Sequence, residues 1–303
     1  MIGALDIGAT TVRAGIVGEC GELIVTRERL IPPGQDARAF MDFTSKLLGS
    51  LAETGEYEID AIGAGSCGVI REGTIVFSPN SSWKRLALAE ALQARFLVPS
   101  FVINDADAFG LGAFHYEFVG KYKGICALTL GSGLGGSLIA DGCAVSGIGG
   151  ISPEVGHMKI RDGGAKCGCG AKGCLEAYVS RYGLMAAYKR NGGDRDALSP
   201  YDVTQAFRRG DKAAAKAYEE LGHYLGVGMA NVFNLFTPQA FIIGGGISRA
   251  NAAFLPAARE AMLKNIMNGL GPKPRIEISK LRSRASLLGA AHYARAQAQG
   301  GKI

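Results

Sequence analysis

Four potential metal ligands fall in one short, glycine-rich segment of the sequence. They are His157, Cys167, Cys169 and Cys174. Three thiolates and one imidazole suit a closed, tetrahedral, structural Zn²⁺ site, because Zn²⁺ prefers sulfur and nitrogen ligands. Gly168, Gly170 and Gly173 allow the tight turns that would direct the three sulfurs to one point. The alternative is a loop whose cysteines lie close together without a metal, but the spacing favours a bound zinc ion.

Two loops rich in small residues follow apolar strands and have the composition of anion-binding turns. The first contains Asp6, Gly8, Ala9, Thr10 and Thr11, and the second contains Gly131, Ser132 and Gly133. Backbone N–H groups in such loops bind phosphate oxygens. One loop of this kind is usually only a turn, but two of them, one near the start of each half, predict a site that clamps a polyphosphate. Asp6 is predicted to hold Mg²⁺ through water, since Mg²⁺ takes oxygen ligands.

Two further strand ends carry residues of chemical interest. Asn104 and Asp105 end an apolar strand, where a carboxylate is placed to accept a proton from a substrate hydroxyl, as phosphoryl transfer to an alcohol requires. Helix N-capping is the alternative for Asp105 or Asp107 taken alone. Gly245 and Gly246 also follow a strand, where bare backbone would let a purine or ribose approach. A strand-to-helix turn explains these glycines equally well.

The first part of the chain has the pattern of an α/β domain. Apolar strands are predicted at the opening IGALDIG and from Leu23, Ile59 and Ser100, and the first two strands are expected to pair as a hairpin. Helices are predicted over residues 36–53, where apolar residues recur at helical spacing, and from Leu86 to Arg95. The order β, β, α, β, α, β predicts an α/β fold.

The same order of elements restarts after residue 106. Strands are predicted from Ile125, in GSLIADG, in GHMKI and from Ala240, and helices near residues 175–190, 211–235 and 285–298. This repetition predicts two α/β lobes with a cleft between them. We expect the first lobe to comprise residues 1–106 with the C-terminal helix, about residues 285–303, and the second to comprise residues 107–284 with the zinc motif.

The composition restricts the classes of function. Of the 303 residues, 48% are hydrophobic, but no apolar run reaches the roughly 18 residues of a membrane span, so we expect no membrane partner. The N-terminus lacks the pattern of a secretory signal, and the cysteines outside the metal segment stand singly. These features predict a cytoplasmic protein with reduced thiols. The net charge of +6 comes from scattered Lys and Arg, which favours solvated faces over a nucleic-acid surface.

The motifs, taken in order, resemble those of the ROK family of repressors and sugar kinases, within the hexokinase/actin/Hsp70 ATPase superfamily. The matching segments are Asp6–Thr11, Asn104-Asp105-Ala106, Leu130–Gly136, Glu154-Val-Gly-His157, the box Cys-Gly-Cys-Gly-Ala-Lys-Gly-Cys-Leu-Glu and Ile242–Gly246. They cover nearly the whole chain. The resemblance implies an α/β, two-lobed actin-like ATPase (ribonuclease H-like) fold with a central cleft and a small structural zinc-binding loop.

The resemblance also implies roles for individual residues. Asp105 would be the general base, and the sugar would be bound by Gly68, Asn80, Asn104, Asp105, Glu154, His157 and Glu176. The two glycine loops, with Gly245 and Gly246, would bind ATP with Mg²⁺. His157 would serve twice, with one ring nitrogen on Zn²⁺ and the other on the sugar, because a metal on one nitrogen fixes the tautomer of the ring.

Some positions depart from the usual pattern of the family. They are Ala9, Thr11, Asp107, Gly149 and Pro153. These residues flank the implied sugar contacts. The departures therefore bear on the identity of the substrate more than on the assignment as a kinase.

The sequence leaves several functions to compare. The first hypothesis is ATP-dependent phosphorylation of the 6-hydroxyl of glucose, with N-acetylglucosamine, N-acetylmannosamine, mannose, fructose or allose as alternative acceptors and ADP or polyphosphate as alternative donors. The second is a sugar-sensing repressor, for which we expect no room for a helix-turn-helix module before Asp6. The third, a filament or chaperone ATPase, would not explain Glu154, His157 and Glu176. A homodimer or higher homo-oligomer is expected from the family.

Overall fold

The computed structural model describes residues 1–78 and 85–301. The chain divides into two compact units. Unit 1 comprises Met1–Ala127, Ser137–Pro153 and Lys280–Ile303, and unit 2 comprises Leu128–Gly136 and Glu154–Ser279. Residues 107–127 and 137–153 thus group with unit 1, unlike in the expected lobes, whose boundaries stay a prediction.

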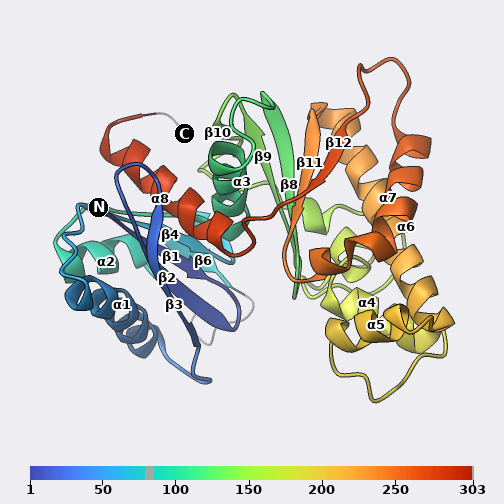
Figure 1. The fold of residues 1–303 in the computed structure, drawn as a ribbon, viewed down its shortest axis with the longest axis horizontal. Helices are drawn as coiled ribbons and strands as arrows, with labels where there is room; N and C mark the ends of the chain where they lie inside the picture. Colours follow the sequence, from blue (N-terminus) through green and yellow to red (C-terminus); the bar gives the residue numbers. More distant parts are fainter. Residues whose placement is uncertain (79–84, 302–303) are drawn as a thin grey trace. The chain divides into compact units, whose positions relative to one another are not determined.

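Unit 1 contains a five-stranded mixed sheet with the order β3-β2-β1-β4-β7 (Figure 1). Its strands are β1 (Ile2–Ile7), β2 (Thr11–Val17), β3 (Leu23–Leu30), β4 (Ala61–Ser66) and β7 (Ser100–Asn104). The pairs among β1, β2 and β3 are antiparallel, whereas β1, β4 and β7 run parallel. The predicted hairpin between the first two apolar segments is wrong. β2 lies between them, because the chain beyond the glycine loop forms a strand that pairs with β1 along its whole length.

Helices cover both faces of this sheet. They are α1 (Ala37–Thr54), α2 (Leu88–Phe96) and α8 (Arg284–Ala298). Side chains of a strand point alternately to opposite faces, so Leu5 and Ile7 of β1 pack with α1 and α2, whereas Ile2 and Ala4 pack with α8. The helices predicted over residues 36–53, 86–95 and 285–298 are confirmed, with small differences at their ends.

Helix α3 (Asp105–Tyr116) begins directly after β7 and packs against α8. A Cβ atom on Gly112 would lie only 1.9 Å from the carbonyl oxygen of Ala285, so the two backbones approach as closely as glycine alone permits. The rings of His115 and His292 stack between the same helices, with centroids 3.8 Å apart and planes inclined by 22°. This packing holds α3, whose first residues form the predicted catalytic segment, against α8.

A short hairpin follows β4 in unit 1. It consists of β5 (Val69–Arg71) and β6 (Thr74–Phe77), neither of which was predicted. Gly68 precedes the hairpin with a φ of +100°, and a Cβ atom there would lie 2.3 Å from the carbonyl oxygen of Phe77. Gly68 is therefore required for the close return of the hairpin onto the end of β4.

A second five-stranded sheet has the order β10-β9-β8-β11-β12. Its strands are β8 (Gly124–Leu130), β9 (Leu134–Ala140), β10 (Cys143–Ala144), β11 (Ala240–Gly244) and β12 (Arg275–Ile278). The strands predicted from Ile125, in GSLIADG and from Ala240 are confirmed. The strand predicted in GHMKI is wrong: Val155–His157 is a 3₁₀ turn, closed by a hydrogen bond from His157 N–H to Glu154 C=O, and Lys159 forms only an isolated bridge with Cys174.

Four α-helices of unit 2 complete the fold in the described part of the chain. They are α4 (Arg181–Arg190), α5 (Pro200–Arg208), α6 (Lys212–Phe236) and α7 (Asn251–Asn265). The helix predicted near residues 175–190 is divided into a 3₁₀ turn, Leu175–Ala177, and α4, because Ser180 caps a new helix start. The prediction for residues 211–235 is confirmed by α6. α5 and α7 were not predicted, and α7 contains Pro256, which weakens its helical pattern.

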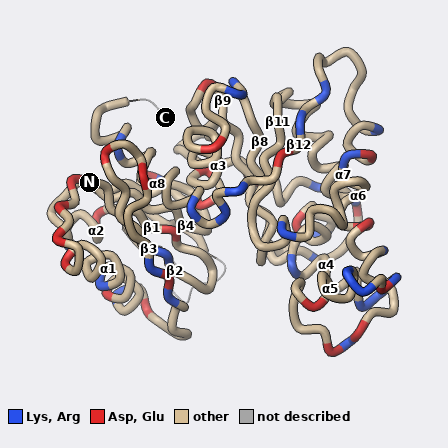
Figure 2. The backbone as a smooth tube through the Cα atoms, viewed as in Figure 1, with Lys and Arg blue, Asp and Glu red and all other residues tan. Residues whose placement is uncertain are grey.

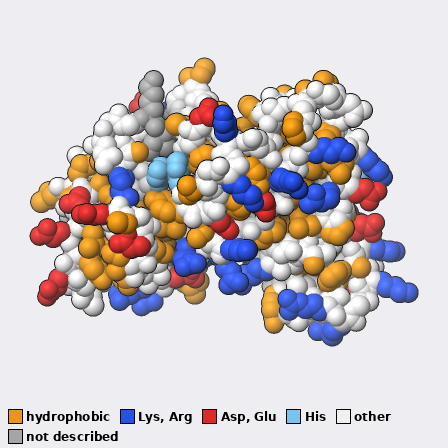
Figure 3. Space-filling view, turned by 45° about the horizontal axis from the view of Figure 1, so that its top comes forward, with side chains coloured by type: hydrophobic (Ala, Val, Ile, Leu, Met, Phe, Trp, Pro, Cys, Tyr) orange, Lys and Arg blue, Asp and Glu red, His pale blue; other side chains and the backbone are white. Residues whose placement is uncertain are grey.

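Charged side chains are spread over many elements. Lys and Arg occur along much of the backbone trace without forming one continuous run (Figure 2). Figure 3 shows charges of both signs, with apolar side chains between them, on one face.

Among the residues that the structure describes, no helix combines the length and the apolar character needed to cross a membrane.

Candidate active site

The four predicted metal ligands come together in unit 2. One ligand atom from each of His157, Cys167, Cys169 and Cys174 lies within 4.8 Å of all the others, and we call this set the metal cluster. The Cys169 and Cys174 sulfurs are 3.8 Å apart, and Cys167 Sγ lies 3.6 Å from His157 Nδ1. Two sulfurs each about 2.3 Å from one tetrahedral ion would be separated by about 3.8 Å. The donor set and its spacing therefore fit a structural Zn²⁺ ion.

Local backbone geometry holds the cysteine loop in this form. Gly173 has a φ of +77°, and a Cβ atom on it would lie 1.7 Å from the carbonyl oxygen of Arg161. The Cys167 N–H donates to Ala171 C=O at 2.8 Å, which closes the turn that carries the first two cysteines. Burial raises the pKa of the Cys167 thiol to about 12, whereas the Ala171 backbone N–H lowers the pKa of Cys169. A divalent cation would favour the thiolate at all three cysteines.

The two ring nitrogens of His157 face different groups. Nδ1 points to Cys167 of the metal cluster, and Nε2 lies 3.8 Å from Glu154 Oε2. Burial raises the pKa of Glu154, while the nearby His157 lowers it. Glu176 is close as well, since its Oε1 lies 3.5 Å from Cys167 Sγ. The residues predicted to bind a sugar from unit 2 thus surround the metal cluster.

The second glycine loop lies against the metal motif in unit 2. Leu134 N–H at the end of this loop donates to Glu176 Oε2 at 3.0 Å. Arg181 N–H, at the start of α4, donates to Gly131 C=O at 2.8 Å. Neither the Leu134 contact nor the Arg181 contact was predicted, because neither follows from local spacing.

The third glycine segment meets the second loop at its first residue. Gly245 has a φ of +84°, and a Cβ atom on it would lie 2.3 Å from the carbonyl oxygen of Leu130. By contrast, open space surrounds the Cβ positions of Gly131 and Gly246. In unit 2, backbone without side chains therefore lies together at the ends of two strands. Such backbone allows a nucleotide to approach closely.

The first glycine loop, in unit 1, is organised around an ion pair. Asp6 is almost fully buried and accepts a hydrogen bond from Arg13 Nη1 at 2.9 Å. Burial raises the pKa of Asp6, and the Arg13 guanidinium acts in the opposite direction. Arg13 was missed because β2 was missed. The run Thr11–Val17, with Val12, Ala14 and Ile16 on one side of the strand, carried the signal for it.

The predicted catalytic segment joins β7 to α3. Asn104 is the N-cap of α3: its Oδ1 accepts from Ala106 N–H at 2.9 Å, and its Nδ2 donates to Gly68 C=O at 3.1 Å. Asp105, half-buried, is the first residue of the helix. The capping role considered for Asp105 or Asp107 thus falls mainly on Asn104. The amide of Asn104 also connects Gly68 to the helix that carries Asp105.

Asp107 and Cys67 border the catalytic segment. Asp107 is 2% exposed and accepts a short hydrogen bond from Ser152, one of the residues that lead toward Glu154. Burial raises the pKa of Cys67 to about 12, and the negative charge of Asp105 acts in the same direction. Asn80, predicted to contact the sugar, lies outside the described residues.

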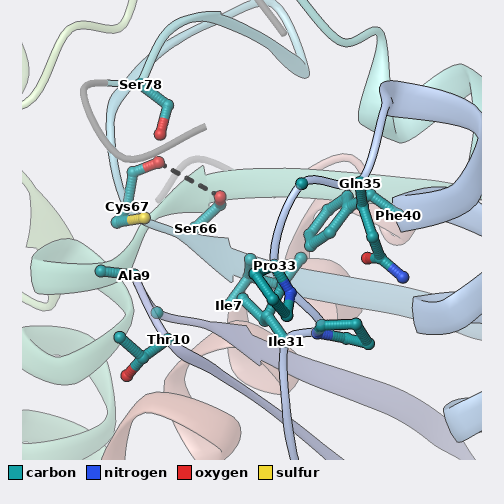
Figure 4. A pocket seen from close by; sticks show the side chains of 13 residues that line it. Ile7, Ala9, Thr10, Ile31, Pro33, Gln35, Phe40, Ser66, Cys67 and Ser78 are labelled. Atoms are coloured by element: carbon teal, nitrogen blue, oxygen red, sulfur yellow. Dashed lines mark hydrogen bonds between the residues drawn. The ribbon is translucent and has the colours of Figure 1, made fainter. Parts of the chain in front are cut away.

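A pocket of about 420 Å³ opens beside the first glycine loop. Its lining is largely apolar, and in Figure 4 Ser66 and Cys67 lie at one end, with Phe40 and Gln35 at the other. The Ser66 hydroxyl donates to the carbonyl oxygen of Cys67 at 3.3 Å. Gly8, Ala9 and Thr10 contribute to the wall, so the pocket adjoins a predicted phosphate-binding loop.

Comparison with known proteins identifies the family. The model of the ROK family matches residues 2–297. The chain belongs to the ROK family. The glucokinase of Streptomyces coelicolor is 31% identical over 96% of each chain. The xylose repressor of Caldicellulosiruptor bescii is 30% identical over 94% of this chain and 75% of the repressor.

A solved structure extends the similarity to the whole fold. The crystal structure of a ROK family glucokinase from Streptomyces griseus, in complex with glucose and AMPPNP, superposes with a TM-score of 0.86 and 29% identity, covering 97% of this chain and 99% of that chain. The expected α/β fold of the actin-like ATPase type is thereby confirmed. These ROK relatives support a sugar-kinase activity.

Proposed function

We propose that this ROK protein transfers the γ-phosphoryl group of ATP to the 6-hydroxyl of a hexose, with glucose as the preferred acceptor. The observation that carries the proposal is the pair of directions in which His157 faces. Nδ1 lies beside the cysteines and Nε2 beside Glu154, so one ring can bind a metal and still offer its second nitrogen to a sugar hydroxyl. The glucokinase from Streptomyces coelicolor supports glucose as the acceptor.

The proposed roles in sugar binding follow the chemistry of the side chains. Glu154, His157 and Glu176 would hydrogen-bond the ring hydroxyls. Asn104, at the end of β7, and Gly68, just after the end of β4, would provide further sugar contacts. Zn²⁺, held by His157, Cys167, Cys169 and Cys174, would order the cysteine loop and fix the tautomer and orientation of His157. Its part would be structural, since four protein ligands leave no open position for substrate.

Asp105 is assigned the role of general base. It would accept the proton of the 6-hydroxyl while the sugar oxygen bonds to the γ-phosphorus and the bond from that phosphorus to the β,γ-bridging oxygen of ATP breaks, giving ADP. A proton acceptor of this kind contributes roughly 10²- to 10⁴-fold to the rate. Asn104 would keep Asp105 in place, because its amide joins the helix start to Gly68.

The nucleotide is assigned to the glycine segments. Gly131, Ser132, Gly133, Gly245 and Gly246 would contact ATP, as would Gly8, Ala9, Thr10 and Thr11 of the first loop. Mg²⁺ would accompany the phosphates, as in other phosphoryl transfers. Asp6 would hold this ion through water, while Arg13 Nη1 bonds one of its carboxylate oxygens at 2.9 Å.

A coupled assay of ATP consumption tests the proposal. Purified protein with Mg²⁺ would be assayed with glucose, mannose, fructose, allose, N-acetylglucosamine and N-acetylmannosamine, and with ADP and polyphosphate as alternative donors. Glucose should be turned over fastest, and Asp105→Asn should lower kcat at least about 100-fold while sugar affinity changes little. Saturable sugar binding without turnover of any donor would favour the sugar-sensing regulator instead, a class to which the xylose repressor of Caldicellulosiruptor bescii belongs.

A homodimer or larger homo-oligomer is also proposed. Several large apolar side chains are exposed on the helices of unit 2, among them Tyr182, Tyr201, Leu235 and Phe236. Burial of such side chains is what stabilises most interfaces between identical chains. Light scattering coupled to size exclusion would give the mass in solution, and a monomer at micromolar concentration would contradict this part of the proposal.

A further inference from the structure

We propose that Glu176 is a positioning residue that couples the metal cluster to the second glycine loop, so that a bound metal strengthens the binding of nucleotide as well as sugar. The proposal rests on the proposed function for the identity of its ligands, a nucleotide at the loop and a sugar beside the metal cluster. Every contact that carries it lies within unit 2.

The first contact joins Glu176 to the loop. Its Oε2 accepts a hydrogen bond from the backbone N–H of Leu134 at 3.0 Å. Leu134 is buried, so this N–H would lose its partner without gaining water if the carboxylate left. A Cβ atom on Gly133 would lie 2.4 Å from the same oxygen. The loop and the carboxylate therefore fit each other closely.

The second contact joins Glu176 to the metal cluster. Its other oxygen, Oε1, lies 3.5 Å from Cys167 Sγ, but a metal-bound thiolate has no proton to donate to it, so the link to the metal runs through the backbone. Cys174, a member of the metal cluster, immediately precedes the 3₁₀ turn that contains Glu176. Leu175 holds this turn in place, because its side chain is fully buried and packs against Gly228 of α6. Glu176 thus has a backbone fixed between Cys174 and Leu175, and from it the side chain presents Oε2 to the loop.

Backbone packing reinforces the connection on both sides of Glu176. A Cβ atom on Gly136 would lie 2.5 Å from the side chain of Val155, and one on Gly156 would lie 2.2 Å from the carbonyl oxygen of Leu134. Val155 and Gly156 directly precede the ligand His157. No free space separates the metal motif from Leu134 and Gly136 at the end of the loop. A displacement of the motif would therefore also move these two residues.

The coupling has a thermodynamic consequence that can be measured without catalysis. Residues that share one hydrogen-bonded network show non-additive effects, and two ligands coupled through such a network change each other's affinity by the same factor. We expect removal of the metal to weaken nucleotide binding about five- to tenfold, the size of one lost buried hydrogen bond. Nucleotide should in turn raise the affinity for the metal by the same factor.

Calorimetric titration with AMPPNP and Mg²⁺, in the absence of sugar, tests this coupling. The proteins would be the wild type, Glu176→Ala, Glu176→Gln and Asp162→Asn, each zinc-loaded and each after chelation. Asp162 is an exposed acid of the same motif, so Asp162→Asn removes one negative charge without touching the loop and should match the wild type. Glu176→Ala should bind AMPPNP about five- to tenfold more weakly when zinc-loaded, and chelation should then weaken binding less than it does in the wild type.

Glu176→Gln separates the hydrogen bond from the charge. The amide oxygen of Gln can still accept from Leu134 N–H, so nucleotide affinity should stay within about twofold of the wild type and should still fall on chelation. Wild-type affinity that is unchanged by chelation, or Glu176→Ala affinity equal to wild type, would overturn the coupling. If Glu176→Ala does not fold, hydrogen exchange of the wild-type segment 130–136 decides: faster exchange after chelation supports the proposal, and unchanged exchange refutes it.

The outcome is distinguishable from failure of the proposed function. A protein that phosphorylates sugar but binds AMPPNP independently of zinc would retain the proposed function and lose the coupling. A protein that phosphorylates no sugar but binds AMPPNP more tightly with zinc would retain the coupling and lose the proposed activity.

Discussion

The two glycine loops look alike in the sequence, yet they are supported by different means. The first, in unit 1, follows β1 and is supported by an ion pair between the buried Asp6 and the partly exposed Arg13. The second, in unit 2, follows β8 and is held by Glu176 and Arg181 on either side of its turn. A loop held by charge depends on its one partner, whereas a loop held by a metal motif depends on that motif being folded. Similar glycine spacing therefore does not imply similar vulnerability.

Loss of the metal should have the largest effect and should separate the two loops. Cys174→Ser removes a buried ligand and should lower the free energy of unfolding of unit 2 by about 5 kcal/mol, well below the full binding energy of structural zinc sites. Hydrogen exchange should accelerate in segment 130–136 and stay unchanged in segment 6–11. Cys20→Ser, at an exposed cysteine, is the control. Equal acceleration in both loops would show that they are not supported independently.

Loss of the ion pair should affect the first loop alone. Arg13→Met leaves the Asp6 carboxylate buried without its charge partner and should destabilise unit 1 by about 3 kcal/mol in denaturant titration. Adding Asp6→Asn should recover part of this loss, because no buried charge then remains. Glu28→Gln removes only the exposed partner of Arg13 and should cost less than about 0.5 kcal/mol. A zinc-dependent effect of Arg13→Met would contradict the separation.

Acid should lower the free energy of unfolding of unit 1 through His292, whose ring stacks on that of His115. Burial, with smaller contributions from His115 and Arg295, lowers the pKa of His292 to about 4. Because the folded state favours neutral His292, its stabilisation is complete above the unfolded pKa of about 6.5 and is lost as the pH falls toward 4. Allowing for partial exposure of the ring, we expect a loss of about 1 to 2 kcal/mol.

Chemical denaturation between pH 4 and pH 7, followed by hydrogen exchange in α8, would measure this loss. His292→Leu should flatten the pH dependence of α8 exchange, whereas His223→Gln, on α6 of unit 2, should leave it unchanged. The same slope in wild type and His292→Leu would exclude His292 as its source.

Alanine substitutions within the loops give the smallest and finest test. Gly133→Ala places a Cβ atom 2.4 Å from Glu176 Oε2 and should cost about 1 kcal/mol of stability, because the carboxylate must leave Leu134 N–H. Gly131→Ala meets open space, and Gly8→Ala in the first loop makes only an ordinary contact at 3.5 Å with Thr11 C=O. Both should cost less than about 0.5 kcal/mol in thermal denaturation. Equal costs at all three positions would indicate backbone strain rather than the Glu176 contact.

Much of the fold was predictable because its signals are local. The β1, β7, β8 and β11 strands each end in small or polar residues after an apolar run, and α1 shows apolar residues at helical spacing, so the elements that carry the predicted site were found. The strand predicted in GHMKI was wrong because Val155–His157 forms a 3₁₀ turn, closed by the hydrogen bond from His157 N–H to Glu154 C=O. β2 was overlooked because its first residue was taken as part of the glycine turn, and Arg13 was lost with it.

The sequence by itself determined which residues form the metal cluster and the glycine segments, because residues within one short stretch must stay close together and their types and spacing show their possible chemistry. Only the tertiary structure decided that Asp6 meets Arg13, that Asn104 caps α3 while holding Gly68, and that Glu176 reaches back to Leu134, 42 residues earlier. Such contacts depend on strand register and helix packing. Both are set by the joint burial of residues far apart in the sequence, which no local pattern encodes.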